Sequence, residues 1–205
     1  MSTPRQIILV GAFVEIIELC DAISVEIVGI IDNSCTGSFQ GRPILGTDTE
    51  ADQILANHPG VPLHITPDSP KVRSKLSELY SRLGALFATL VHPEAFLAPS
   101  ATVGAGSAIQ ARAQVSAETS IGCGVKVNTG ANVTHDVEIG DFVMIAPAAV
   151  LLGRTRVGPR AYIGANATIL PGISIGQDAL VGAGTTVTRD VLAGAKIVGF
   201  SGKLL

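Results

Sequence analysis

Residues 127–145 read VNTGANVTHDVEIGDFVMI, and every sixth residue from Val127 onward is aliphatic. When the same step is extended in both directions, all sixteen positions from Leu97 to Val187 are aliphatic, without a shift in register. A period of six matches neither an amphipathic helix nor an ordinary strand. Such a fixed repeat indicates stacked units that share one core. The pattern therefore predicts a column with three flat faces, in which three hexapeptides form one coil.

Two further positions of the repeat have a restricted composition. The residue two places before the aliphatic position is usually small, as in Ala101, Ser107 and Ala113, which would let each corner close. The residue directly after it is often glycine, and we expect these glycines to adopt turn conformations that a Cβ resists. Five of them are eighteen residues apart and should stack along one edge: Gly104, Gly122, Gly140, Gly158 and Gly176. The unbroken register predicts that no long loop leaves the column.

Residues 1–92 have a different rhythm, so we predict two domains, 1–92 and 93–205. Apolar runs predict strands at 6–10, 26–31 and 62–65, and residues 87–91 lead into the column. Helices are expected at 14–22, at 47–57 after a Thr-x-x-Glu capping box, and at 69–83. The last helix should carry an apolar face formed by Val72, Leu76, Leu79, Tyr80 and Leu83, and Gly84 should end it. Alternating strands and helices favour a small parallel α/β sheet.

The start of this domain has the outline of a nucleotide-binding unit. A strand, Gly11, a helix and an acid about 20 residues later, Asp32, follow the expected order. The turn contains one glycine instead of three, and Phe13 and Val14 would fill the space that phosphate oxygens need. Asp32 either binds a ribose hydroxyl or closes the strand as a turn residue, and the sequence leaves both readings open.

His135 lies two residues after the inward position Val133, which places it near a corner of the column, facing outward. Asp136 follows it, and Asn128 lies seven residues earlier. An imidazole titrates near neutral pH, so it can accept a proton from an attacking amine or hydroxyl, and a carboxylate can orient the ring. The alternative is an exposed corner histidine without a role.

Composition excludes several classes of function. The chain has 205 residues, a net charge of −3 and no basic run, so we expect no nucleic-acid partner. Its three cysteines lack metal or redox spacing, and the first apolar run is too short for a signal peptide or membrane span. A cytoplasmic protein without a metal or membrane insertion is the expectation. Charged residues make up only 15%, which suggests that some surface is buried between subunits.

Residues 128–141, NTGANVTHDVEIGD, resemble the active-site stretch of the bacterial sugar acetyltransferases. This family includes the sialic acid O-acetyltransferase and the N-acetyltransferases of nucleotide-linked 4-amino sugars. The resemblance continues through residues 145–147, 163–169, 171–173, 181–184 and 197–199, and through 27–32 and 43–46 in the first domain. Phe200-Ser201 departs from the family's usual Pro-Ala pair. The first turn lacks the family's glycine-rich loop with a histidine.

The resemblance implies a Rossmann-like domain followed by a left-handed parallel β-helix. It implies a homotrimer that transfers acetyl from acetyl-CoA to an amino or hydroxyl group of a nucleotide-linked sugar in surface-glycan biosynthesis. His135 would be the general base and Asp136 its orienting partner. The groove between two columns would hold acetyl-CoA, with the Gly153 N–H near the thioester carbonyl. The other assignments it implies are Ala165, Gly182 and Ala183 for the cofactor, and Gly11, Asp32 and Asn128 for the substrate.

Three other functions compete with this one. A non-nucleotide acceptor such as serine fits the column, although typical serine acetyltransferases carry a helical domain in front of it. A non-catalytic binding module would need no residue like His135. A zinc carbonic anhydrase needs three histidines around one subunit interface. The repeat offers only His135, with His92 just before it.

Overall fold

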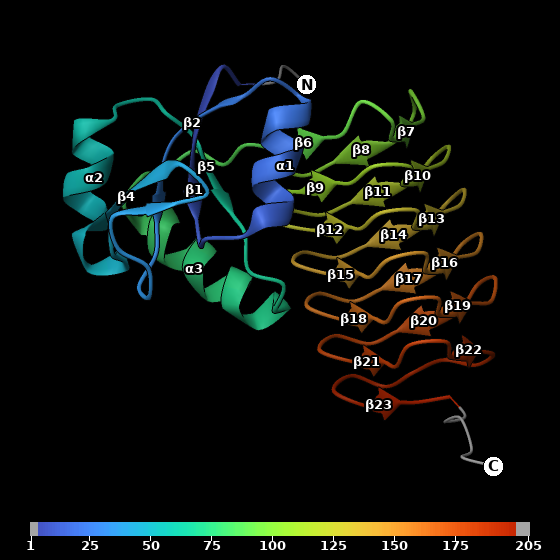
Figure 1. Cartoon of the computed structure of the whole chain (residues 1–205). Helices are drawn as coiled ribbons and strands as arrows, with labels where there is room; N and C mark the ends of the chain where they lie inside the picture. The colour runs from blue at the N-terminus through green and yellow to red at the C-terminus, as the bar shows by residue number, and fades with distance from the viewer. Residues whose placement is uncertain (1–3, 200–205) are drawn as a thin grey trace, which may run out of the picture.

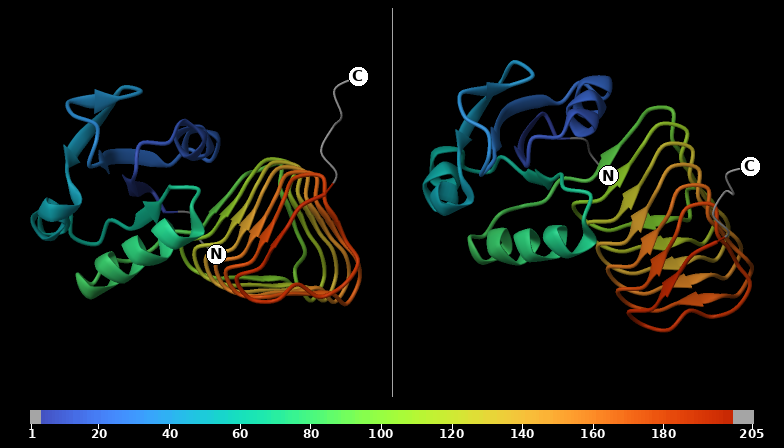
Figure 2. Two further views of the ribbon diagram at one scale, coloured as in Figure 1. Left: turned by 90° about the horizontal axis from the view of Figure 1, so that it is seen from below. Right: turned by 60° about the horizontal axis from the view of Figure 1, so that its bottom comes forward.

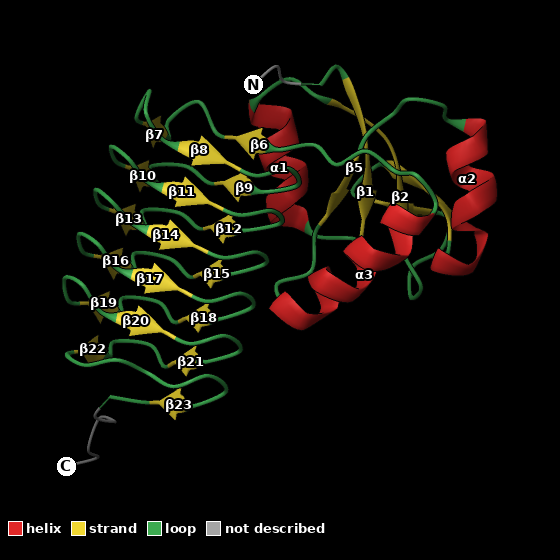
Figure 3. Ribbon diagram, turned by 180° about the vertical axis from the view of Figure 1, so that it is seen from behind, coloured by secondary structure: helices red, strands yellow, loops and turns green. Residues whose placement is uncertain are grey.

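The computed structural model describes residues 4–199, which form a small α/β domain beside a three-sided column (Figure 1). All helices of the described chain lie in the first domain, and the column is built from short strands and turns alone (Figure 3). No helix in these residues is long and apolar enough to cross a membrane.

The first domain contains a five-stranded sheet in the order β3-β4-β2-β1-β5. Its elements are β1 (Gln6–Val10), α1 (Val14–Ala22), β2 (Glu26–Ile31), β3 (Ser38–Phe39), β4 (Arg42–Gly46), η1 (Asp48–Glu50), α2 (Ala51–Asn57), β5 (Leu63–Ile65) and α3 (Pro70–Arg82). The predicted strands and helices are present. The hairpin of β3 and β4 was not predicted, and because β3 is antiparallel to β4 the sheet is mixed. The strand β3 has only two residues, flanked by Gly37 and Gly41 with positive φ, so it leaves little periodic signal.

The predicted helix starts agree with the structure because local hydrogen bonds define them. The Thr47 amide donates to the Glu50 carboxylate at 2.9 Å, which completes the capping box in front of α2. The Ser69 side chain accepts a hydrogen bond from the Val72 amide at the start of α3, where Pro70 takes the first helical position.

The predicted face of α3 is only partly buried, with Tyr80 and Leu76 packed against the apolar cluster beside the sheet. Val72, Leu79 and Leu83 are exposed, whereas Arg73 and Tyr80 are completely or almost completely buried. One side of α3 packs against β5 of the sheet, and Arg73 near its start reaches the column. The Tyr80 hydroxyl donates to Asp48 at 2.6 Å, and the Arg73 guanidinium bonds only to carbonyl oxygens. Apolar periodicity cannot detect such a helix face.

The column consists of two-residue strands that pair in parallel with the strand one coil later. We number its three sheets as faces: face 1 contains β7, β10, β13, β16, β19 and β22; face 2 contains β8, β11, β14, β17 and β20; face 3 contains β6, β9, β12, β15, β18, β21 and β23. The strands are β6 (Leu90–Val91), β7 (Phe96–Leu97), β8 (Thr102–Val103), β9 (Ala108–Ile109), β10 (Gln114–Val115), β11 (Ser120–Ile121), β12 (Lys126–Val127), β13 (Asn132–Val133), β14 (Glu138–Ile139), β15 (Met144–Ile145), β16 (Val150–Leu151), β17 (Arg156–Val157), β18 (Tyr162–Ile163), β19 (Thr168–Ile169), β20 (Ser174–Ile175), β21 (Leu180–Val181), β22 (Thr186–Val187) and β23 (Lys196–Ile197).

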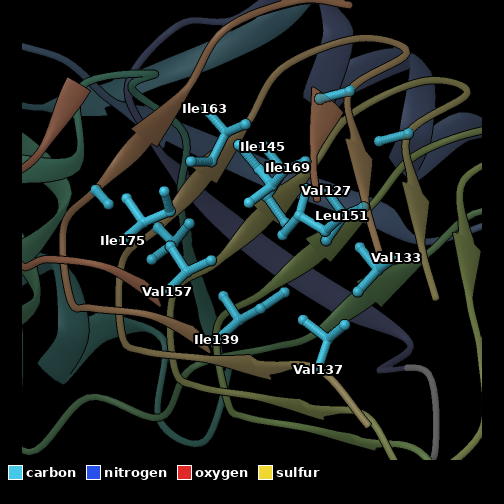
Figure 4. Close-up of a cluster of buried hydrophobic side chains, with 14 of the residues drawn as sticks. Val127, Val133, Val137, Ile139, Ile145, Leu151, Val157, Ile163, Ile169 and Ile175 are labelled. Atoms are coloured by element: carbon cyan, nitrogen blue, oxygen red, sulfur yellow. The ribbon is translucent and has the colours of Figure 1, made fainter. Parts of the chain in front are cut away.

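The sixteen predicted aliphatic residues are each the second residue of a strand, from Leu97 to Val187. All except Leu97 and Val103 are buried, and they fill the interior of the column (Figure 4). No loop leaves the column between these two ends of the repeat. This confirms the left-handed parallel β-helix that the resemblance implied.

The glycines of the repeat stack as predicted, but for a different reason. None of those that directly follow the aliphatic position has a positive φ. The left-handed conformation falls two residues later, and Arg112, Asp136 and Phe142 adopt it with φ of 57°, 58° and 59°. A Cβ on Gly104 would lie 2.5 Å from the carbonyl carbon of Gly122 in the next coil. These glycines are therefore required because successive coils approach closely at this edge.

The two ends of the column deviate from the regular repeat. Its first strand, β6, precedes the predicted domain boundary at residue 92 and pairs with β9. At the other end β23 pairs with β21 in a shortened last coil, where Lys196 is opposite Leu180. The Phe200-Ser201 pair lies outside the described residues.

Candidate active site

His135 and Asp136 occupy the corner between face 1 and face 2, between β13 and β14. The backbone of this corner is held from both sides. The Asp136 amide donates to Ala117 in the previous coil at 3.0 Å, and the Arg154 amide donates to the His135 carbonyl at 3.2 Å from the next coil. The left-handed φ of Asp136 completes the turn. Both side chains therefore project from a rigid backbone, with 61% and 52% of their surfaces exposed.

The imidazole and the carboxylate form a pair suited to proton transfer. His135 Nδ1 lies 2.7 Å from Asp136 Oδ2. Because a carboxylate accepts hydrogen bonds, this contact favours the tautomer with hydrogen on Nδ1. Nε2 then carries a free lone pair, and within residues 4–199 it has no hydrogen-bond partner. The arrangement can accept a proton from a nucleophile that approaches Nε2.

Gly153 lies directly against the imidazole from the next coil. A Cβ at Gly153 would lie 2.6 Å from Cε1 and 2.8 Å from Nε2 of His135, so only glycine leaves room for this ring position. Its carbonyl accepts a hydrogen bond from Gly172, while its N–H has no partner in the described part of the chain. A free backbone donor thus stands beside a free imidazole nitrogen.

The other residues expected to bind the cofactor lie at a different corner. Ala165, Gly182 and Ala183 belong to the corner between face 3 and face 1, after β18 and β21. The whole of face 1 separates them from His135 and Gly153. One chain therefore does not bring the five residues together.

Gly11 and Asp32 do lie together, in a cavity of about 240 Å³ at the carboxyl ends of β1 and β2. Asp32 Oδ2 accepts from the Ala12 amide at 2.8 Å, and Oδ1 accepts from the Ser34 amide, the Ser34 hydroxyl and the Cys35 amide. Partial burial opposes ionisation of this carboxyl, but the hydrogen bonds outweigh it and lower the pKa of Asp32. Asp32 is therefore an ionised turn residue, and Oδ2 retains one acceptor position toward the cavity.

The first turn differs from the expectation. Gly11 has a φ of 102°, and a side chain there would collide with Thr66. We expected the Phe13 ring to fill this space, but it does not line the cavity. It is turned toward the column, where Lys126 Nζ lies 5.4 Å from its centroid. The apolar ring is partly buried at the joint between the domains, and this burial and the cation–π contact explain its position.

Asn128 is buried at the corner between faces 3 and 1, with its amide nitrogen 3.5 Å from the Met144 sulfur. It is not beside His135 in the same chain.

The first domain packs on face 3, where Lys126 donates hydrogen bonds to Thr66 and Asp68. The view along the column shows this domain beside one side of a triangle (Figure 2). His135 lies on the corner that joins the other two sides. This corner is the one farthest from the cavity at Gly11 and Asp32 of the same chain.

Sequence reasoning did not identify the buried cations of the domain joint, Arg73 and Lys126. The sequence gives no indication that Arg73 is buried, because the leucines of its helix suggest that another side is buried. For Lys126 the sequence gives a weak indication. The outward residues before and after it on face 3 are Ala108 and Met144, both buried, which indicates a covered face with one lysine in it.

Comparisons with known proteins show the family and support the fold. A family model for the hexapeptide repeat of succinyl-transferase matches residues 154–189. The acetyltransferase domain of PglB from Neisseria gonorrhoeae FA1090 is 31% identical, with a TM-score of 0.90 over 96% of this chain and 97% of that chain. The chain belongs to this family of hexapeptide-repeat sugar acetyltransferases. It is accordingly an acyltransferase.

Two further members of the family are similar over nearly their whole length. PerB from Caulobacter crescentus, solved with CoA and GDP-perosamine, is 30% identical, with a TM-score of 0.89 over 95% of this chain and 94% of that chain. WeeI from Acinetobacter baumannii AYE is 26% identical, with a TM-score of 0.85 over 94% and 96%. A comparison with curated protein sequences finds no match. Within residues 4–199 no three metal-ligating side chains come together.

Proposed function

We propose that this acetyltransferase transfers acetyl from acetyl-CoA to an amino group of a nucleotide-linked sugar. The observation that carries the proposal is the His135 imidazole, held by Asp136 and placed against Gly153 with Nε2 free. PerB supports the acceptor class, because that relative is a perosamine N-acetyltransferase solved with CoA and GDP-perosamine. Acetyl-CoA is a cytoplasmic metabolite, so we place the reaction there, as a step of surface-glycan biosynthesis.

The residues support a direct transfer. His135 Nε2 takes a proton from the acceptor amine as its nitrogen attacks the thioester carbonyl carbon. The Gly153 N–H is available to the oxygen of the tetrahedral intermediate, and one such donor can be worth about 3 kcal/mol. When the carbon–sulfur bond breaks, the protonated imidazole returns a proton to the leaving thiolate. Asp136 stabilises the imidazolium between these two steps.

We propose that the working unit is a homotrimer with shared sites. Coils rise by about 4.8 Å, so the seven residues from Asn128 to His135 correspond to a height of only about 2 Å. A threefold axis parallel to the column keeps heights equal in all subunits. It can therefore place Asn128 of one subunit opposite His135 of the next. The cavity at Gly11 and Asp32 then serves the histidine of a neighbouring subunit.

The same arrangement explains the two groups of cofactor residues. Gly153 on one subunit would face the other corner of its neighbour, where Ala165, Gly182 and Ala183 lie toward the carboxyl-terminal coils. We propose that acetyl-CoA lies in this groove, with the thioester at Gly153 and the rest of the molecule along the neighbour's corner.

The test is a screen of UDP-, GDP- and dTDP-linked amino and hydroxy sugars with acetyl-CoA, in which free thiol release is measured. Turnover of an amino sugar nucleotide is expected. Thiol release with serine or free sugars but with no nucleotide sugar would favour a non-nucleotide acceptor. The absence of acetyl-CoA binding in calorimetry would instead favour a non-catalytic module.

A further inference from the structure

The loop of residues 66–68, between β5 and α3, belongs to the cavity at Gly11 and Asp32. The Thr66 hydroxyl lies within hydrogen-bond distance of the carbonyl oxygens of Val10, at 2.9 Å, and Gly11, at 2.8 Å. Its amide also donates to Val10 at 2.9 Å. Pro67 lines the cavity itself. The position of this loop therefore sets the position of the first turn.

The column holds the same loop through Lys126. Lys126 Nζ donates to the Thr66 carbonyl at 2.6 Å and to Asp68 Oδ1 at 2.8 Å. Only 4% of its side chain is exposed. The Phe13 ring of the first turn lies over the same ammonium group. One side chain of face 3 thus contacts both loops that form the cavity.

Arg73 holds the next two carbonyl groups of the loop and extends to the column. Its Nη1 donates to Pro67 at 2.9 Å and Asp68 at 2.6 Å. Its other donors reach Gly124 at 3.0 Å, and Phe142 and Val143 of the following coil at 2.9 Å and 3.2 Å. All five guanidinium N–H groups are used, and the three consecutive carbonyl groups of the loop are all bound by cations.

Adhesion alone does not account for these buried charges. Burying an ion costs several kcal/mol, and apolar side chains can join two domains without that cost. The joint already has such a cluster, which includes Leu19, Leu90 and Ala108. Burial lowers the pKa of Arg73 to about 10, so the guanidinium stays charged at neutral pH. The cations instead orient the 66–68 loop, because each hydrogen bond fixes one of its carbonyl groups.

We propose that Lys126, assisted by Arg73, is a positioning residue for the acceptor: it holds the 66–68 loop and the first turn in the geometry that binds the nucleotide part of the substrate. The inference rests on the proposed function for the identity of the ligand. It predicts that loss of Lys126 affects the acceptor and not acetyl-CoA, because the side-chain contacts of Lys126 are to Thr66, Asp68 and Phe13 and to none of the residues proposed for acetyl-CoA.

The test compares Lys126→Met with the conservative Lys126→Arg and with Lys75→Met. Lys75 is an exposed lysine of α3 outside the cavity lining. For Lys126→Met we expect KM for the nucleotide sugar to rise about tenfold or more, with kcat and the acetyl-CoA Kd within about twofold of wild type. Lys126→Arg should recover most of the KM, and Lys75→Met should behave as wild type. If KM is unchanged while the melting temperature falls, Lys126 only joins the domains and the proposal is wrong.

A second measurement is independent of turnover. Hydrogen exchange of the free protein should show faster exchange at the amides of residues 11–13, Thr66 and Asp68 in Lys126→Met than in wild type. Unchanged exchange there would overturn the positioning role. If wild type turns over no nucleotide sugar, the proposed function fails, yet this exchange measurement still decides whether Lys126 holds the cavity. Should Lys126→Met not fold, Arg73→Lys, which keeps the charge and loses the fork, takes its place.

Discussion

Mixed trimers offer a strict test of whether one site uses two subunits. The first variant, His135→Ala, removes the base. The second, Val72→Glu, places a carboxylate in the cavity beside Asp32, where it should repel an anionic nucleotide. Val72 is exposed and lies three residues after the Ser69 cap of α3, so a glutamate there forms a capping box and should preserve the fold. Each variant alone is expected to have little activity at low acceptor concentration.

The size of the recovery follows from the geometry. His135 lies on the corner farthest from its own cavity, so the proposed shared site needs an unchanged His135 in one subunit and an unchanged cavity in the next. When the two variants are unfolded together in equal amounts and refolded, random assortment gives about half of the subunits an intact His135. About half of their neighbours have an intact cavity, so about a quarter of the wild-type activity should return. A site contained in one chain would return none.

A matched control uses a chain with both changes mixed with wild type in equal amounts. A shared site again predicts about a quarter of the wild-type activity, whereas a site within one chain predicts about half. Mass measurement must show trimers in every mixture, and acetyl-CoA must still bind to each variant. Activity near half in the control, with none in the test mixture, would refute the shared site.

Three further predictions test the corner, the column and the domain joint. Gly153→Ala should displace the imidazole, because its Cβ would lie 2.6 Å from His135 Cε1. We expect kcat to fall at least tenfold while circular dichroism shows an unchanged fold, and a normal kcat would contradict the contact between Gly153 and His135. Gly158→Ala should lower the free energy of unfolding by about 1–3 kcal/mol, because its Cβ would lie 2.5 Å from a backbone nitrogen of the next coil. Ala148→Gly, at φ 56°, should raise the free energy of unfolding by up to about 1 kcal/mol. Urea unfolding measures both, and the opposite order would show that the glycine after the aliphatic position is required for its turn conformation. His64 is fully buried, and its Nε2 has no hydrogen-bond partner within residues 4–199. Burial lowers its pKa to about 4, so the stability that comes from its neutral form is complete above pH 6.5 and is lost as the pH falls toward 4, at up to about 1.4 kcal/mol per pH unit. A pH series of urea midpoints should be flatter in His64→Leu, and identical slopes would exclude this contribution.

The sequence predicts the column well because one constraint repeats without interruption. Every turn of the chain must return an aliphatic side chain to the interior, so the register from Leu97 to Val187 is visible in the residues themselves. The same register correctly places His135 at an outward corner. The role of the repeat's glycines could not be read in this way. A positive φ and a close approach of backbones both favour glycine, and only coordinates separate the two causes.

The acceptor side of the site was less predictable, because it depends on how two domains join. Asp32 and Gly11 are recognisable from their order along the chain, and they do lie together. The face of the column that their domain covers is marked by an apolar cluster and by contacts of Arg73 and Lys126, two side chains with no periodic pattern. Their contacts place the domain on face 3, and therefore opposite His135. The resulting separation supports the proposed trimer: the proposed base and the proposed substrate cavity, which one chain holds apart, can act together only when another copy brings them into contact.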